Sequence, residues 1–303
     1  GAGMALAQWM HDGHPPFDLW DVDIRRAQPF QRNKLYLKER VEETLGLLYA
    51  DHFPYRQVET AREIRRSPLH NHLKERGAVF GELAGWERAN WFAKEGQENY
   101  YIYDWGRQNW FTNHKEEHDA VRQSAGLFDM TSFGKIRVDG SDACSFLQYL
   151  CCSEVDVPVG RIVYTQMLNK KGGIECDLTV TRLSSESYLL VVPGATLQRD
   201  LSWLRKHKSE YSVSIIDFTS AEAVLVLMGP NSRKIMQKVS PDDFSNDSHP
   251  FGFAKEIEVG LTGAFLCSQI FGEKMAQNKK GVILNVASDL SVIAPDQRIY
   301  KKK

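Results

Sequence analysis

Alternation of apolar and polar residues in the second half of the chain predicts a series of strands. Strands are expected at 161–168 and 176–183, joined through residues 169–173, with Leu178 and Val180 alternating toward a core. The same reading predicts strands at 135–138, 188–194, 213–217 and 224–228, and helices at 142–150 and 197–207. This order predicts an α+β fold with a mostly antiparallel sheet and flanking helices.

Helical periodicity is clearest at the beginning of the chain. Residues 34–49 predict an amphipathic surface helix, because apolar residues recur on or near one side of it: Leu35, Val41, Leu45 and Leu48. Residues 1–13 predict a shorter helix that Gly13 closes. A helix that contains His114 is expected to run toward residues 127–130. Residues 51–107 combine aromatic residues, arginines and helix breakers without a clear period, so no element is predicted there.

The composition limits the classes of partner. The 303 residues are 42% hydrophobic and carry 38 basic and 39 acidic side chains, a net charge of −1. This balance gives no global field for nucleic acid, and no apolar run is long enough to span a membrane, so neither partner is expected. Five cysteines without a CxxC pair argue against a disulfide framework and a structural zinc site. His114 and His118 are also not expected to bind a metal, because Lys115 stands where the zinc protease motif has its glutamate.

The candidate chemistry lies in the stretch Gly172-Gly173-Ile174-Glu175-Cys176-Asp177. Adjacent glycines permit a positive φ and a close approach of the backbone to a ligand. Asp177 follows them at the rim of a strand, where a carboxylate can contact an amine or a cation. The alternative is a solvated acid beside a hairpin turn, and the residues of this stretch alone leave both interpretations open.

An ordered series of short motifs surrounds this stretch. The motifs are Asp23-Ile24-Arg25-Arg26, Arg65-Arg66-Ser67-Pro68-Leu69, Gly85-Trp86-Glu87-Arg88, Leu127-Phe128-Asp129-Met130, Tyr164-Thr165, Asn169, Gly172-Gly173-Ile174, Asp177 and Met228-Gly229-Pro230. Over about residues 1–260 they resemble the flavin-dependent dimethylglycine and sarcosine dehydrogenase family. The regulatory subunit of pyruvate dehydrogenase phosphatase shares this architecture, and its folate-binding part is similar to the aminomethyltransferase of the glycine cleavage system.

The resemblance implies a division of the chain into parts. Residues 1–30 match the tail of a truncated FAD-dependent oxidoreductase domain, with Gly1 and Gly3 in its final glycine-rich turn near the flavin. Residues 31–90 match the linking domain of the flavoenzyme family. Residues 110–260 match the N-terminal part of an aminomethyltransferase-like, folate-binding domain. Because Gly1 is not an initiator methionine, the sequence is expected to start inside a larger reading frame.

Residues 261–303 resemble a different family, the short-chain dehydrogenases, and are expected to form an α/β fragment. Ser288 matches the serine that binds the substrate carbonyl in that family. The glycine-rich nucleotide loop is missing, and no Tyr-x-x-x-Lys follows Ser288. The plainest hypothesis is that two unrelated coding fragments meet near Gly260, through a gene-model error or a real fusion.

The resemblance to the folate-binding module also assigns site residues. Asp177 matches the acid that contacts the pterin and its reactive nitrogen, and Cys176 replaces a preceding acid. Phe133, Tyr164 and Val192 match positions that line the folate, and Gly194 takes the place of an asparagine.

The expected function is therefore the folate-binding portion of a dimethylglycine or sarcosine dehydrogenase-type FAD oxidoreductase, which transfers a one-carbon unit to tetrahydrofolate. FAD would belong to the domain that is mostly missing. The alternative is a non-catalytic regulatory subunit with a protein partner, and a short-chain dehydrogenase is a further alternative. The resemblance implies the bacterial cytoplasm or the mitochondrial matrix, and no targeting segment is visible.

Overall fold

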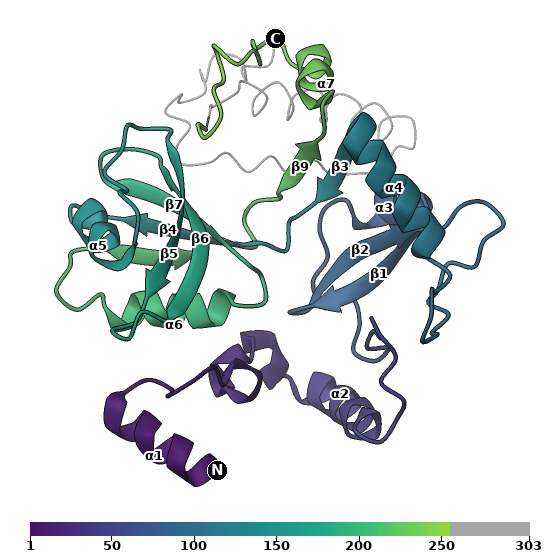
Figure 1. The fold of residues 1–303 in the computed structure, drawn as a ribbon, viewed down its shortest axis with the longest axis horizontal. Coiled ribbons are helices and arrows are strands. Elements are labelled where there is room, and N and C mark those ends of the chain that lie inside the picture. Colours follow the sequence, from purple (N-terminus) through teal and green to yellow (C-terminus); the bar gives the residue numbers. More distant parts are fainter. Residues whose placement is uncertain (255–303) are drawn as a thin grey trace, which may run out of the picture.

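A five-stranded antiparallel sheet forms the largest element of the protein, whose computed structural model describes residues 1–254 (Figure 1). Its strand order is β5-β6-β7-β4-β8. The strands are β4 (Gly134–Asp139), β5 (Ile162–Leu168), β6 (Ile174–Arg182), β7 (Ser187–Val192) and β8 (Ser214–Asp217). Each strand predicted in these regions is confirmed, and so are the α+β class and the mostly antiparallel pairing.

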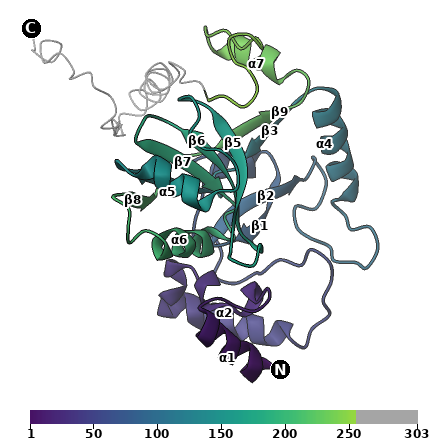
Figure 2. The same cartoon turned by 60° about the vertical axis from the view of Figure 1, so that its left-hand side comes forward.

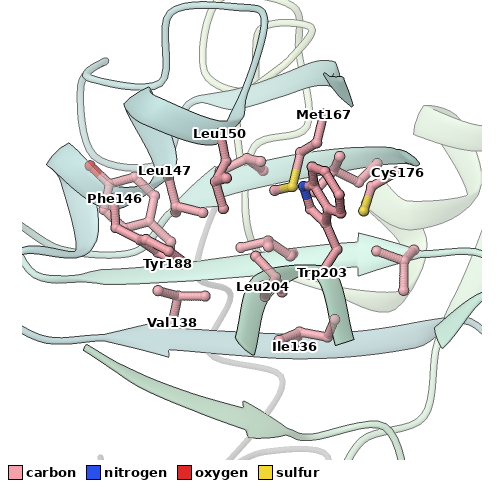
Figure 3. Close-up of a cluster of buried hydrophobic side chains, with 14 of the residues drawn as sticks. Ile136, Val138, Phe146, Leu147, Leu150, Met167, Cys176, Tyr188, Trp203 and Leu204 are labelled. Carbon is pink, nitrogen blue, oxygen red and sulfur yellow. The ribbon is translucent and has the colours of Figure 1, made fainter. Parts of the chain in front are cut away.

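The main hydrophobic core lies on one face of this sheet, beneath helices α5 (Ala143–Leu150) and α6 (Leu197–Lys206). Alternate residues of the strands point toward it, as the period of two requires. Figure 3 shows side chains of both helices meeting those of the strands. The fully buried members include Ile136, Val138, Phe146, Leu147, Tyr188, Leu190 and Leu204. The opposite face of the sheet is therefore the one that can carry exposed polar groups.

Two smaller antiparallel sheets lie beside the main one. Strands β1 (Ala78–Leu83) and β2 (Trp86–Phe92) form the first, in the stretch where no element was predicted. Strands β3 (Gly126–Asp129) and β9 (Leu225–Met228) form the second. The predicted continuation of a helix toward residues 127–130 is wrong, because α4 (Phe111–Gln123) ends before Gly126 pairs with Met228.

The N-terminal segment forms helices at one end of the molecule (Figures 1 and 2). Helix α1 (Ala2–Asp12) ends at Gly13, whose φ of 72° is the left-handed value that favours glycine. Three short 3₁₀ turns follow: η1 (Trp20–Val22), η2 (Ile24–Arg26) and η3 (Pro29–Arg32). Helix α2 (Lys34–Leu47) starts at Asn33, whose side chain accepts a hydrogen bond from the backbone N–H of Leu35. Both helices confirm their predictions.

Two further short helices complete the described chain. Helix α3 (His70–Glu75) precedes β1, and α7 (Ser232–Val239) follows β9. Among residues 1–254, none of the helices combines the length and the apolar character needed to cross a bilayer.

Candidate functional site

The turn between β5 and β6 is held by the side chain of Asn169. Its Oδ1 accepts hydrogen bonds from the backbone N–H groups of Lys171, at 2.9 Å, and Gly173, at 3.0 Å. Gly172 has a φ of 80°, so it needs the freedom of glycine, as the sequence predicted for this turn. The turn fixes the register in which Gln166 of β5 faces Asp177 of β6.

Asp177 lies on the sheet face away from α5 and α6, and its side chain is exposed. Its neighbours Cys176 and Leu178 are buried on the other face. The Gln166 side chain donates a hydrogen bond from Nε2 to Asp177 Oδ1 at 3.2 Å. The hydroxyl of Tyr164 lies beside the Asp177 carboxylate, whose proximity raises the pKa of Tyr164. Tyr164, Gln166 and Asp177 therefore form a polar cluster, which we call the Asp177 cluster.

A buried acid lies beneath the strand that carries Asp177. Asp200 of α6 is 1% exposed and accepts a hydrogen bond from Thr196 Oγ1 at 2.8 Å. Burial raises its pKa to about 6, against the opposing effects of Thr196 and Arg199. Its carboxyl also faces the thiol of Cys176, and burial raises the pKa of that thiol. Cys176 of β6 thus packs against Asp200 of α6. A carboxylate in place of the Cys176 thiol would repel Asp200.

The predicted lining residues do not all lie beside Asp177. Val192 is buried in the main core, on the opposite face of the sheet. Phe133 is half-buried in the connection between β3 and β4. Gly194 approaches the backbone so closely that a Cβ would lie 2.2 Å from the carbonyl oxygen of Ser132. An asparagine side chain at this position would therefore require the backbone to move.

The predicted flavin and dehydrogenase residues contribute no observed site. Gly1 caps α1 and Gly3 lies within it, and a Cβ on either would meet no atom within 4 Å. Within the described chain, no close contact therefore requires glycine at either position. Ser288 and the short-chain dehydrogenase resemblance lie outside the described residues.

Two residues on the Asp177 face of the sheet were missed by the sequence analysis. Gln166 is the cross-strand partner of Asp177, and the alternation of β5 with Tyr164 was the signal that could have identified it. Lys135 of β4 is 1% exposed, and its Nζ donates to the carbonyl oxygens of Thr131, at 2.9 Å, and Phe133, at 3.0 Å. Burial lowers the pKa of Lys135. A lone lysine in an otherwise regular strand carried no signal of burial.

Several cavities lie apart from the Asp177 cluster, and two of them border the hairpin or the elements described above. One of about 630 Å³ lies between β2, α4 and β3, where aromatic side chains including Trp91, Trp110 and Phe128 line it. The other, of about 330 Å³, separates residues 14–25 from the β5–β6 hairpin. The lining of neither cavity includes Phe133, Tyr164, Asp177 or Val192.

Comparison with curated proteins identifies homologues that are about three times longer than the matched region. A 4-methylaminobutanoate oxidase (formaldehyde-forming) of Paenarthrobacter nicotinovorans is 41% identical, over 86% of this chain and 31% of its own length. The mitochondrial pyruvate dehydrogenase phosphatase regulatory subunit of Mus musculus is 33% identical, over 86% of this chain and 30% of its own. The mitochondrial sarcosine dehydrogenase of Homo sapiens is 32% identical, over 86% and 33%.

A search of solved structures and two family models complete the comparison. The glycine cleavage system aminomethyltransferase T of Bartonella henselae covers 58% of this chain and 44% of its own, with 26% identity and a TM-score of 0.47. The family "FAD dependent oxidoreductase central domain" matches residues 12–67, and the family "GCVT N-terminal domain" matches residues 69–271. The chain is thus homologous to sarcosine and dimethylglycine dehydrogenases. Because the second family model covers more than half of its residues, the chain belongs to the GCVT N-terminal domain family.

Proposed function

We propose that the protein is the tetrahydrofolate-binding, aminomethyltransferase-like portion of an FAD-dependent oxidoreductase of the dimethylglycine and sarcosine dehydrogenase type. The observation that carries the proposal is the exposed carboxylate of Asp177, held on a sheet face by a hydrogen bond from Gln166 and lying beside Tyr164. The chain spans about a third of the length of its curated relatives, so the activity of the whole enzyme is part of the proposal.

The Asp177 cluster offers the groups that the polar edge of a pterin needs. The Asp177 carboxylate would accept hydrogen bonds from amine N–H groups, and the Gln166 amide orients one of its oxygens. Tetrahydrofolate would supply the nucleophilic nitrogen that takes up the one-carbon unit. Asp177 would orient that amine and stabilise positive charge on it during transfer.

Apolar contacts to the ring would come from the same face of the sheet. Val192 is committed to the core, whereas Val191 pairs with Thr179 and therefore lies on the Asp177 face. The exposed ring of Tyr164 lies there as well. We therefore assign the apolar contact that the family resemblance placed at Val192 to Val191 and Tyr164. No step is assigned to FAD in this proposal.

Calorimetric titration with tetrahydrofolate under anaerobic conditions tests this proposal. Asp177→Asn keeps the shape of the side chain and removes its charge, so we expect binding to weaken by roughly tenfold to a hundredfold. Glu186→Gln removes one exposed charge in the connection between β6 and β7 and should leave the affinity within about twofold. Absence of any binding heat from the unaltered chain at millimolar ligand would contradict the proposal.

A second candidate is a non-catalytic regulatory subunit. It is favoured by the 33% identity to the mouse pyruvate dehydrogenase phosphatase regulatory subunit, which spans 86% of this chain. In this case the chain would act through a protein partner and would not require folate. Co-sedimentation with a pyruvate dehydrogenase phosphatase catalytic subunit, together with unchanged binding by Asp177→Asn, would favour this function over the first.

A further inference from the structure

Helix α2 packs against the protein through the ring of Tyr36, which is buried, and through two charged side chains, Arg40 and Glu43. Arg40 donates to Glu82 Oε2 at 2.9 Å and to the carbonyl oxygen of Thr60 at 2.7 Å. The carboxylate of Glu43 accepts hydrogen bonds from the backbone N–H groups of Glu59, at 2.7 Å, and Thr60, at 2.9 Å. These contacts determine which side of the helix faces inward.

Another side of α2, together with the residue that follows the helix, presents an apolar stripe to solvent. The α2 stripe consists of Leu37, Val41, Leu45 and Leu48, which recur at the helical intervals of four, four and three. Their side chains are between 43% and 64% exposed. A helix on the surface of a complete domain has the reverse arrangement, with its apolar side inward. The orientation therefore indicates a face that another protein surface covers.

The stripe lies in the part of the molecule where exposed apolar side chains are most concentrated. Within residues 1–254, twelve of the thirty-one exposed large hydrophobic residues fall in the first 49 positions. Helices α1 and α2 both lie at this end of the molecule in the two views (Figures 1 and 2). Single exposed apolar residues are ordinary on protein surfaces, but a concentration of them marks an interaction surface.

The comparisons indicate the occupant. All of α2 falls within residues 12–67, which match the central domain of FAD-dependent oxidoreductases. The 41% identical oxidase is covered over only 31% of its length, so most of that protein lies outside the matched region. We propose that the α2 stripe docks the FAD-binding part of an oxidoreductase of this family. This inference rests on the family match and the orientation of α2, and it does not depend on folate binding by Asp177.

Other occupants fit the charges less well. Residues 34–43 of α2 include three basic and three acidic side chains, Lys34, Lys38 and Arg40 against Glu39, Glu42 and Glu43. A helix that lies on an anionic membrane instead carries a basic excess on its polar side. A second copy of the chain would need the same stripe to be self-complementary about a twofold axis.

Biolayer interferometry tests this proposal. It measures binding of the full chain to the FAD-loaded part of the Paenarthrobacter oxidase, meaning the part of that oxidase that this chain does not cover. We expect Val41→Asp combined with Leu45→Asp to raise the Kd by at least about tenfold, because charges would replace two apolar contacts. Glu42→Gln, a control on the flank of the same helix, should leave the Kd within about twofold. Absence of binding by the unaltered chain, or equal binding by the stripe variant, would overturn the proposal.

A second measurement covers the case in which the separated part does not retain FAD. The positions aligned with Val41 and Leu45 are then changed to Asp in the intact oxidase. The expected result is loss of bound FAD or faster proteolysis between its domains, with an unchanged circular dichroism spectrum. Retention of both properties would contradict the proposal. Two further results would also contradict the proposal. The first is a dimer of the unaltered chain that the stripe variant abolishes. The second is co-sedimentation of the unaltered chain with phosphatidylserine vesicles that the stripe variant abolishes.

Discussion

Asp200 connects the chemistry of a single buried carboxyl to the stability of the sheet that carries Asp177. Its pKa in the folded protein is about 6, whereas an unfolded chain gives a value near 3.9. Because the folded value is higher, the native state gains stability from the protonated form, and this gain is complete below about pH 4. It is lost as the pH rises toward 6. The shift of about two units corresponds to roughly 3 kcal/mol.

Asp200→Asn removes this titration and tests it directly. The quantity to follow is the free energy of unfolding of the variant minus that of the unaltered chain. We expect this difference to increase by about 2–3 kcal/mol from pH 4 to pH 7.5. Urea denaturation at both pH values measures the difference. Glu210→Gln, an exposed control, should show a difference of less than about 0.5 kcal/mol. A difference for Asp200→Asn that is the same at both pH values would contradict the raised pKa.

The hairpin of β5 and β6 is the element that places Asp177 opposite Gln166. Its turn depends on two hydrogen bonds accepted by the side chain of Asn169. Asn169→Ala leaves both backbone N–H groups without this partner, so we expect a loss of about 1–2 kcal/mol in the free energy of unfolding. Hydrogen exchange of the Lys171 and Gly173 amides should accelerate, whereas Lys170→Ala, at an exposed position of the same turn, should leave it unchanged. Equal exchange in both variants would show that the turn does not need Asn169.

At the scale of the whole molecule, α6 holds the N-terminal segment against the main sheet. The Arg199 guanidinium lies 5.1 Å from the ring centre of Trp20, and Lys206 Nζ donates to the carbonyl oxygen of Gly13 at 3.0 Å. A cation stacked on a tryptophan contributes about 0.5–2 kcal/mol, depending on its exposure. Because these contacts join segments about 180 residues apart in sequence, they determine how the N-terminal helices are placed.

Trp20→Ala should therefore loosen the N-terminal segment without unfolding the sheet. We expect trypsin to cleave at Arg25, Arg26 and Arg32 several-fold faster, by roughly three- to tenfold, because local opening becomes easier. Trp105→Ala removes an exposed tryptophan elsewhere and should leave this rate unchanged. An unaltered cleavage rate in Trp20→Ala would mean that Trp20 does not hold the segment.

The elements with strong local periodicity were predictable, whereas β1 and β2, in a stretch without a clear period, and β3 were not. The strands of the main sheet and both N-terminal helices follow the apolar pattern of their own residues. Strand β3 was missed because its regular backbone partner is β9, about a hundred residues later in the chain. The site was likewise predictable only in part. The sequence identified Asp177 as a candidate, but Gln166 becomes its partner only through the register of the hairpin.

The sequence by itself determined that residues 34–49 favour a helix and that Asp177 lies in an alternating strand, because both depend on neighbours along the chain. The tertiary structure decided which side of each element is covered. Packing of Tyr36 and Arg40 against the protein leaves the α2 stripe outward, and packing beneath α6 takes Val192 into the core. Burial depends on which distant segments pack against each other, and a local pattern of residues does not specify this packing.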